Sequence, residues 1–193
     1  MKNFFLYDPK LLLYGFLIIF FASYGQTFFI SLFNIEIRNQ YNLTDGQFGL
    51  VYAIATTLSS LLLVVFAKLI DHIDLRLYSF IVSAGIFLAC LGMFFFIKNI
   101  LFLFLIIFAL RFFGQGAMSH AGETTMARYF GKNRGKAISI ATLGGMSGVM
   151  FLPIIVINLM HTYTINQVWL MASFTIVFFI PLLFITLSNQ STR

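Results

Sequence analysis

The sequence contains few charged residues. Only 12 Lys and Arg and 6 Asp and Glu occur among 193 residues, whereas 60% of the residues are hydrophobic and the mean hydropathy is +0.95. A soluble domain carries about 25% charged residues because its surface must stay polar. The shortage of charge therefore excludes an ordinary soluble domain and indicates a chain that is surrounded largely by lipid.

Cysteine and histidine are also scarce. The single cysteine, Cys90, lies in an apolar run, which excludes a disulfide framework and a thiolate metal cluster. The three histidines, His72, His120 and His161, are far apart in the sequence and form no metal-binding pattern. We therefore expect neither a metal site nor a cofactor.

Long hydrophobic runs are abundant. A hydrocarbon core about 30 Å thick requires roughly 20 apolar residues per helix. The first run is too long for the hydrophobic region of a signal peptide, and no cleavage site of the A-x-A type follows it. The sequence predicts an all-α membrane protein in which residues 1–193 form a single unit of six transmembrane helices: Leu11–Phe33, Phe48–Leu69, Tyr78–Ile97, Ile100–Gly122, Ala137–Met160 and Val168–Leu187.

The basic residues predict the orientation of these helices, because cytoplasmic connections carry an excess of Lys and Arg. Arg38 and Lys98 lie on one side of the membrane. The side that holds both termini has nine: Lys2, Lys10, Lys68, Arg76, Arg128, Lys132, Arg134, Lys136 and Arg193. We therefore expect an inner-membrane protein with both termini in the cytoplasm. The net charge of +6 then reflects topology and not nucleic-acid binding.

Polar residues at helical spacing indicate which spans face the interior of a bundle. They occur in the first span (Ser23, Tyr24, Gln26, Thr27), the second (Thr56, Thr57, Ser59, Ser60), the fourth (Arg111, Gln115, Ser119) and the fifth (Thr142, Ser147, Asn158). The third and sixth spans are more apolar and are expected to face lipid. Any single Ser or Thr can instead bond to its own helix backbone. From this pattern we expect Gln26, Tyr24, Thr57, Gln115 and Thr142 to line a solute-binding cavity.

Arg111 is the one charged residue in the middle of a span. Roughly 13 residues at 1.5 Å each separate it from Lys98 at the outer surface, which places it about 20 Å deep. A charge at that depth costs several kcal/mol and seldom lacks a role. The acidic residues lie near the surfaces, and Glu123 is about 18 Å away on the same helix. We interpret Arg111 as a receptor for an anion; the alternatives are bonding to backbone carbonyls or to an acid of a partner chain.

Glycines in the fourth and fifth spans indicate close helix packing. Gly114 and Gly116 flank Gln115, and Gly144 and Gly148 form a pair of small residues four positions apart. Pro153 follows in the fifth span, where it is expected to kink the helix.

Several of these residues resemble motifs of the major facilitator superfamily. The segment "RFFGQG" is similar to the R-x-x-x-G-x-G signature of that family, matched at Arg111, Gly114 and Gly116 with a spacing shorter by one residue. The connection "AKLIDHIDLR" matches the family's gate motif at Leu69, Asp71 and Arg76, and departs from it at Ala67, His72, Asp74 and Leu75. The segment "ARYFGKNRGKAISIATLGGMSG" is most similar to the monocarboxylate and oxalate–formate branch.

The resemblance implies a transporter that moves a small solute by alternating access. It places Arg111 and Gln115 in a central site and assigns Asp71, Arg76 and Arg128 to a cytoplasmic gate. The branch favours a small organic anion such as a monocarboxylate. Transporters of this type need two six-helix halves, so the chain is expected to be the N-terminal half. Its partner would be either a missing C-terminal half or another chain.

Two other interpretations remain open. The segment "GMSG" fits the G-x-S-G of rhomboid-type intramembrane serine proteases, with Ser147 as the nucleophile. That chemistry needs a histidine at membrane depth to accept the serine proton, and the only later histidine, His161, is expected in an external loop. The second alternative is a truncated half that does not transport and serves in assembly.

Overall fold

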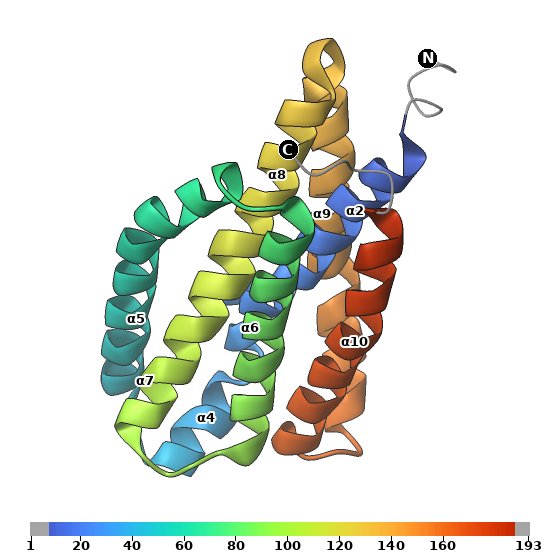
Figure 1. The fold of residues 1–193 in the computed structure, drawn as a ribbon. Coiled ribbons are helices and arrows are strands. Elements are labelled where there is room, and N and C mark those ends of the chain that lie inside the picture. Colours follow the sequence, from blue (N-terminus) through green and yellow to red (C-terminus); the bar gives the residue numbers. More distant parts are fainter. Residues whose placement is uncertain (1–7, 188–193) are drawn as a thin grey trace.

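The computed structural model describes residues 8–187 as a bundle of helices without strands. Six segments are long and apolar enough to cross a membrane, which confirms the predicted fold class (Figure 1). They are Pro9–Ser31, Asp45–Asp71, Leu75–Phe95, Ile100–Tyr129, Gly131–Met160 and Ile165–Thr186. The predicted boundaries differ from these by a few residues, because charged residues such as Arg128 and Arg134 extend helices beyond the apolar stretch.

Several of these spans consist of more than one helical element. The second span comprises α5 (Asp45–Phe66) and the 3₁₀ turn η2 (Ala67–Asp71). The third and sixth spans are the uninterrupted helices α6 (Leu75–Phe95) and α10 (Ile165–Thr186). The fourth combines α7 (Ile100–Ala109), the π-helix η3 (Leu110–Met118) and α8 (Ser119–Tyr129). The fifth combines η4 (Gly131–Asn133) and α9 (Arg134–Met160).

The first span is broken, although the sequence predicts one helix over Leu11–Phe33. Helix α2 (Pro9–Ala22) runs into the 3₁₀ turn η1 (Ser23–Gly25), and the chain is extended at Gln26 before α3 (Thr27–Ser31) begins. At the break the backbone passes directly against η3. Glycine at position 25 permits this close approach, because a side chain there would collide with the backbone of η3. A Cβ atom built on Gly25 would lie 2.7 Å from the Cα of Gly114, and one on Gly114 would lie 2.6 Å from the Cα of Gly25.

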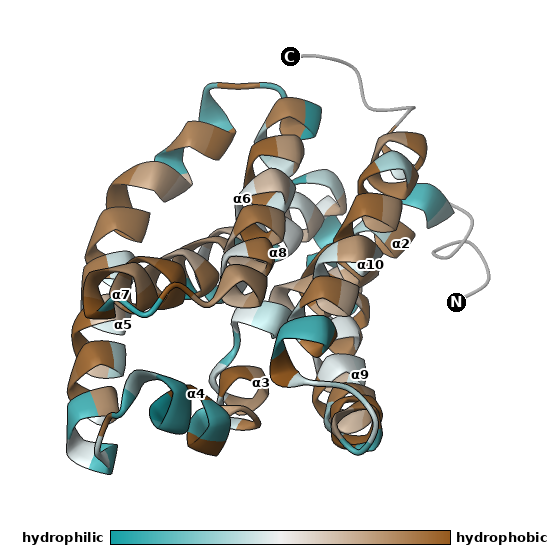
Figure 2. Cartoon of the chain, turned by 90° about the horizontal axis from the view of Figure 1, so that it is seen from below, coloured by the Kyte–Doolittle hydropathy of each residue, from teal (hydrophilic) through white to brown (hydrophobic). Residues whose placement is uncertain are grey.

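The connection after the first span contains a short helix, α4 (Asn34–Tyr41), where the sequence indicates only a polar link. It is hydrophilic, in contrast to the six spans (Figure 2). Asn42 ends it in the left-handed conformation with φ of 54°, and Arg38 forms an ion pair with Asp45 at the start of α5. The short helix therefore joins the first and second spans through defined contacts.

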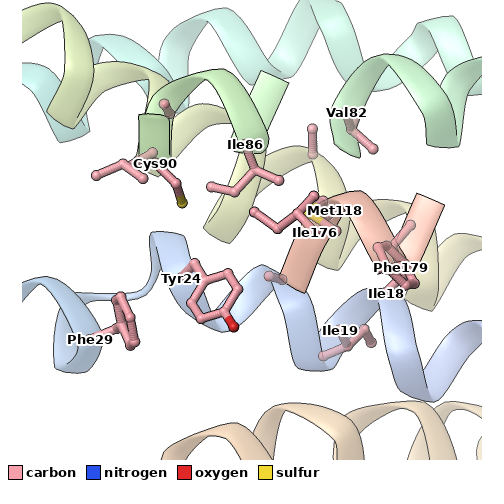
Figure 3. Packing of buried hydrophobic residues seen from close by; sticks show 14 of the residues in the cluster. Ile18, Ile19, Tyr24, Phe29, Val82, Ile86, Cys90, Met118, Ile176 and Phe179 are labelled. Atoms are coloured by element: carbon pink, nitrogen blue, oxygen red, sulfur yellow. The ribbon is translucent and has the colours of Figure 1, made fainter. Parts of the chain in front are cut away.

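The helices of the bundle pack in a definite order. The most extensive contacts join α2 with α9 and α6 with α10, and η3 contacts α5, α6 and η1. Buried apolar side chains from α2, α6, η3 and α10, including Ile18, Ile86, Met118 and Ile176, meet in the interior (Figure 3). Helix α5 lies at one edge (Figure 1), and only 11% of its apolar 18-residue stretch is buried, against 50% for that of α6. The third span therefore has a buried inner face, although its sequence alone suggests only a lipid-facing wall.

Replacing Gly25 or Gly114 by alanine is expected to destabilise the protein by about 1–3 kcal/mol, because the added methyl group must push two backbones apart. The change is measured as a lower midpoint of thermal unfolding in detergent. Gly49→Ala is the matched control, because a Cβ atom on Gly49 in α5 would meet nothing within 4 Å. A midpoint for Gly25→Ala equal to that of Gly49→Ala would contradict the close backbone contact.

Candidate functional site

Arg111 lies at the start of η3, and its side chain is only 6% exposed. The Nη1 atom donates to the carbonyl of Gly25 and to the Thr27 hydroxyl, each at 3.1 Å. The Nε atom donates to the Thr56 hydroxyl on α5 at 3.2 Å. The guanidinium carbon also lies 5.4 Å from the ring centre of Tyr52, close enough for a cation–π contact. Arg111 thus ties the fourth span to the first and second.

The break in the first span places these acceptors. Gly25 ends η1 and Thr27 begins α3, so the carbonyl and the hydroxyl lie on either side of the extended residue Gln26. Tyr52 supports the arrangement, because its hydroxyl donates to the same Thr27 hydroxyl at 2.9 Å. Irregular backbone at membrane depth is tolerated where protein groups satisfy it, and the guanidinium supplies the donors here.

A pocket of about 120 Å³ lies beside the guanidinium. Residues of α5 and η3 line it: Ser59, Ser60, Leu63, Arg111, Gln115 and Gly116. The Oε1 atom of Gln115 is buried and has no hydrogen-bond partner within the described residues 8–187. In the same part of the chain, the Nη2 atom of Arg111 makes no hydrogen bond. The structure therefore brings the two residues expected in a central site, Arg111 and Gln115, to one pocket that has unused hydrogen-bonding capacity.

The π-helical winding of η3 is part of this geometry. It spans nine residues and includes Arg111, Gly114, Gln115 and Gly116. Helices with this winding are rare and are frequent at functional sites. The sequence gives no sign of it beyond the two glycines.

The other residues expected to bind solute lie elsewhere. Tyr24 is buried, and its hydroxyl bonds to Thr175 on α10 at 2.8 Å (Figure 3 shows its ring near Phe29). Thr57 is exposed on α5, and Thr142 on α9 donates to the carbonyl of Ser139 in its own helix. Gln26 occupies the break itself and is half-buried. In the described part of the chain, none of these four side chains lines the pocket or bonds to Arg111.

The residues that bond to Arg111 or line its pocket carry a weak sequence signal. Thr56, Ser59 and Ser60 are spaced by three and four positions, which puts them on one face of a helix. That spacing favours Thr56 over Thr57. Gly25 gives no such signal, because its role depends on a carbonyl that only the break positions. Tyr52 resembles any aromatic residue at the end of a membrane helix.

The three residues expected at a gate separate into two groups. Arg128 forms an ion pair with Asp71, and its Nη1 atom also donates to the carbonyl of Ile70 at 3.4 Å. Arg76 lies apart from this pair, and its Nε and Nη2 atoms donate to the carbonyl of Leu187 at 3.0 and 2.8 Å. Asp71 and Arg128 thus link the second span to the fourth, whereas Arg76 links the third to the sixth.

The glycines identified in the sequence lie at close contacts. A Cβ atom on Gly144 would collide with the backbone of Phe16, one on Gly148 would collide with Ser23, and one on Gly116 would lie 3.1 Å from Leu63. Pro153 lies inside α9, which continues to Met160. Gly144 and Gly148 thus allow α9 to approach the first span closely, whereas Gly116 brings η3 close to α5.

The described residues provide no protease or metal centre. The Ser147 hydroxyl donates to the carbonyl of Leu143 in its own helix, and His161 caps the end of α9, about 20 Å further along the axis. No group of three His, Cys, Asp or Glu residues between 8 and 187 could hold a metal ion.

These features define a multi-pass membrane protein with a small polar pocket beside a buried guanidinium. The sequence model of the Major Facilitator Superfamily matches residues 15–192, and the chain belongs to that family. No curated protein and no solved structure matches the chain. Membership indicates membrane transport of a small solute, and members are typically transporters and not enzymes.

Replacing Thr56 by valine is expected to lower the stability by about 1–3 kcal/mol, because the Nε atom of a buried guanidinium then loses its acceptor. Thr57→Val serves as the control, since Thr57 has the same chemistry one position later and is exposed. Thermal unfolding of both variants in detergent measures the difference. Equal midpoints would show that the bond between Arg111 and Thr56 contributes nothing.

Proposed function

We propose that this chain is the N-terminal half of a transporter for a small organic anion, such as a monocarboxylate, of the monocarboxylate and oxalate–formate branch. Arg111 binds the anion, and the chain works by alternating access together with a second six-helix half. The observation that carries the proposal is a buried cation with no negative partner among the described residues 8–187.

Each acidic residue of the chain has a partner or a position away from Arg111. Asp45 pairs with Arg38 and Asp71 pairs with Arg128. Asp8 and Asp74 cap the starts of α2 and α6. Glu36 belongs to α4, and Glu123 is exposed on α8, twelve positions beyond Arg111. None of these six carboxylate side chains is therefore available to neutralise the guanidinium.

The acceptors around Arg111 satisfy hydrogen bonds without cancelling its charge. A carbonyl and two hydroxyls are neutral, and a charge in the hydrocarbon region remains costly unless an opposite charge approaches it. The alternative in which Arg111 only bonds to backbone accounts for one of its three hydrogen bonds, because the other two are to the hydroxyls of Thr27 and Thr56.

The pocket favours a small, planar anion. A carboxylate can accept two parallel hydrogen bonds from an arginine, and such charge-assisted pairs are stronger than neutral ones. The Gln115 amide lies in the same lining and offers a further donor. A volume of about 120 Å³ supports a ligand of few heavy atoms. The substrate class proposed here follows from that size and charge.

A second six-helix half completes the proposed transporter. Helices α5 and α9 belong to the least buried spans, with 11% and 28% of their apolar 18-residue stretches buried. We assign these faces to contacts with the second half, and the ion pair of Asp71 with Arg128, together with Arg76, to the gate. The excess of basic residues on the side of the membrane that holds both termini supports a cytoplasmic location of these termini in the inner membrane.

Arg111→Ala is expected to reduce the uptake of a labelled monocarboxylate by about 10- to 100-fold, because a hydrogen bond to a charged group contributes about 1.5–3 kcal/mol. Uptake is measured with the complete transporter in proteoliposomes. Arg111→Lys should restore only part of the activity, since an ammonium group cannot bind a carboxylate bidentately.

Arg134→Gln is the control for a loss of positive charge, because Arg134 lies exposed at the first position of α9. It should leave uptake unchanged. Uptake by Arg111→Ala at the wild-type rate would refute the assignment of the binding site.

A further inference from the structure

The hydrogen bonds of Arg111 leave one nitrogen of its guanidinium free. The Nε atom donates to the Thr56 hydroxyl at 3.2 Å, and the Nη1 atom donates to the Gly25 carbonyl and the Thr27 hydroxyl, each at 3.1 Å. Among the described residues 8–187, no group accepts a hydrogen bond from Nη2. The guanidinium therefore offers an incoming anion one unoccupied nitrogen and not two.

A carboxylate that binds an arginine with both oxygens needs two N–H groups that point in the same direction. The guanidinium is planar and its donors form a fixed fork. The parallel pairs are Nε with Nη2 and Nη1 with Nη2. Because Nε and Nη1 both have protein acceptors, a carboxylate bound through both oxygens must displace one of those acceptors.

The position of the pocket decides which acceptor is displaced. Thr56 precedes the lining residues Ser59 and Ser60 by three and four positions, so it lies on the same face of α5. The hydroxyls of these two serines donate to the Thr56 carbonyl at 2.8 and 2.9 Å. The described lining of the pocket includes neither Gly25 nor Thr27. An anion in the pocket therefore meets the edge of the guanidinium formed by Nε and Nη2, where Thr56 is the acceptor.

The exchange of Thr56 for a carboxylate is favourable on electrostatic grounds. A carboxylate oxygen brings the opposite charge, which none of the three present acceptors supplies. The displaced hydroxyl of Thr56 keeps a partner, because a threonine within a helix can donate to the carbonyl of an earlier turn. The two bonds from Nη1 are not involved, so Arg111 stays attached to the first span.

We propose that the Thr56 hydroxyl occupies the place of the anion in the empty site and is displaced when a carboxylate binds Nε and Nη2 together. This inference rests on the proposed function and adds a residue that sets the affinity for the anion. Thr56 satisfies the buried guanidinium while the site is empty and competes with the ligand for it. Binding of the anion then releases the middle of α5 from the fourth span.

The test uses Thr56→Val, which removes the hydroxyl at nearly constant volume. The midpoint of thermal unfolding of the purified chain in detergent is measured over a series of sodium acetate concentrations, with sodium chloride replaced so that the ionic strength is constant. Without acetate the variant should unfold at a lower temperature than the wild type, because Nε has lost its acceptor. A ligand that binds the folded state raises both midpoints.

The two curves should converge as acetate approaches saturation, because the bound state no longer uses the bond to Thr56. Convergence means that the variant binds acetate more tightly, by about 3- to 10-fold, the factor that corresponds to the net contribution of one hydrogen bond. Thr56→Ser keeps the hydroxyl and should follow the wild-type curve. Arg111→Ala should show no rise with acetate. If Thr56→Val yields no folded protein, Thr56→Ala replaces it with the same expected convergence.

Two kinds of result would overturn the inference. Parallel curves would show that the bond to Thr56 survives binding, and diverging curves would show that Thr56 itself binds the anion. Either result would leave anion binding at Arg111 standing. A wild-type midpoint that acetate does not raise, or a rise that persists in Arg111→Ala, would overturn the inference together with the proposed function.

Discussion

The hydrogen bonds from Arg111 to the broken first span are the interaction on which the centre of this bundle depends. A guanidinium at this depth is tolerated only with several acceptors, and an interrupted helix is tolerated only with donors for its displaced groups. Each feature supplies hydrogen-bond partners to the other, although the charge of the guanidinium is not neutralised by these bonds. The carbonyl of Gly25 and the hydroxyl of Thr27 flank the break, and both accept from the same Nη1 atom.

This mutual dependence explains the glycines around it. The break can reach Arg111 only if η1 and η3 approach at backbone distance, and Gly25 and Gly114 provide that approach. The π-helical winding widens η3 at the same point and carries Gln115 and Gly116 to the pocket. The pocket is thus a consequence of how two irregular segments fit together.

The sequence predicts much of the fold and part of the site. Six apolar runs predict six spans because the bilayer imposes a length and a composition on each. Arg111 can be predicted as a site residue, because a charged side chain among apolar residues costs free energy in the membrane and is seldom without a role. The partners of Arg111 are harder to predict, because Gly25 acts through its backbone and Thr56 differs from Thr57 only by its direction on the helix. Tyr24 is a polar residue that the sequence predicts in the site but that has a structural contact instead, because its hydroxyl joins η1 to α10 through Thr175.

The position of the pocket at one edge of the bundle has a further consequence. Among the described residues 8–187, those that line it belong to α5 and η3, and α5 is in the least buried of the six spans. A site formed by so few elements gains or loses access when a single helix moves. The ion pair of Asp71 with Arg128 fixes the end of the second span against the fourth, whereas the bond from Thr56 fixes its middle to Arg111. An anion that competes for the guanidinium would weaken the second attachment and leave the first intact. If Arg111 binds an anion as proposed, ligand binding and the position of α5 are physically linked through the side chain that supplies the charge.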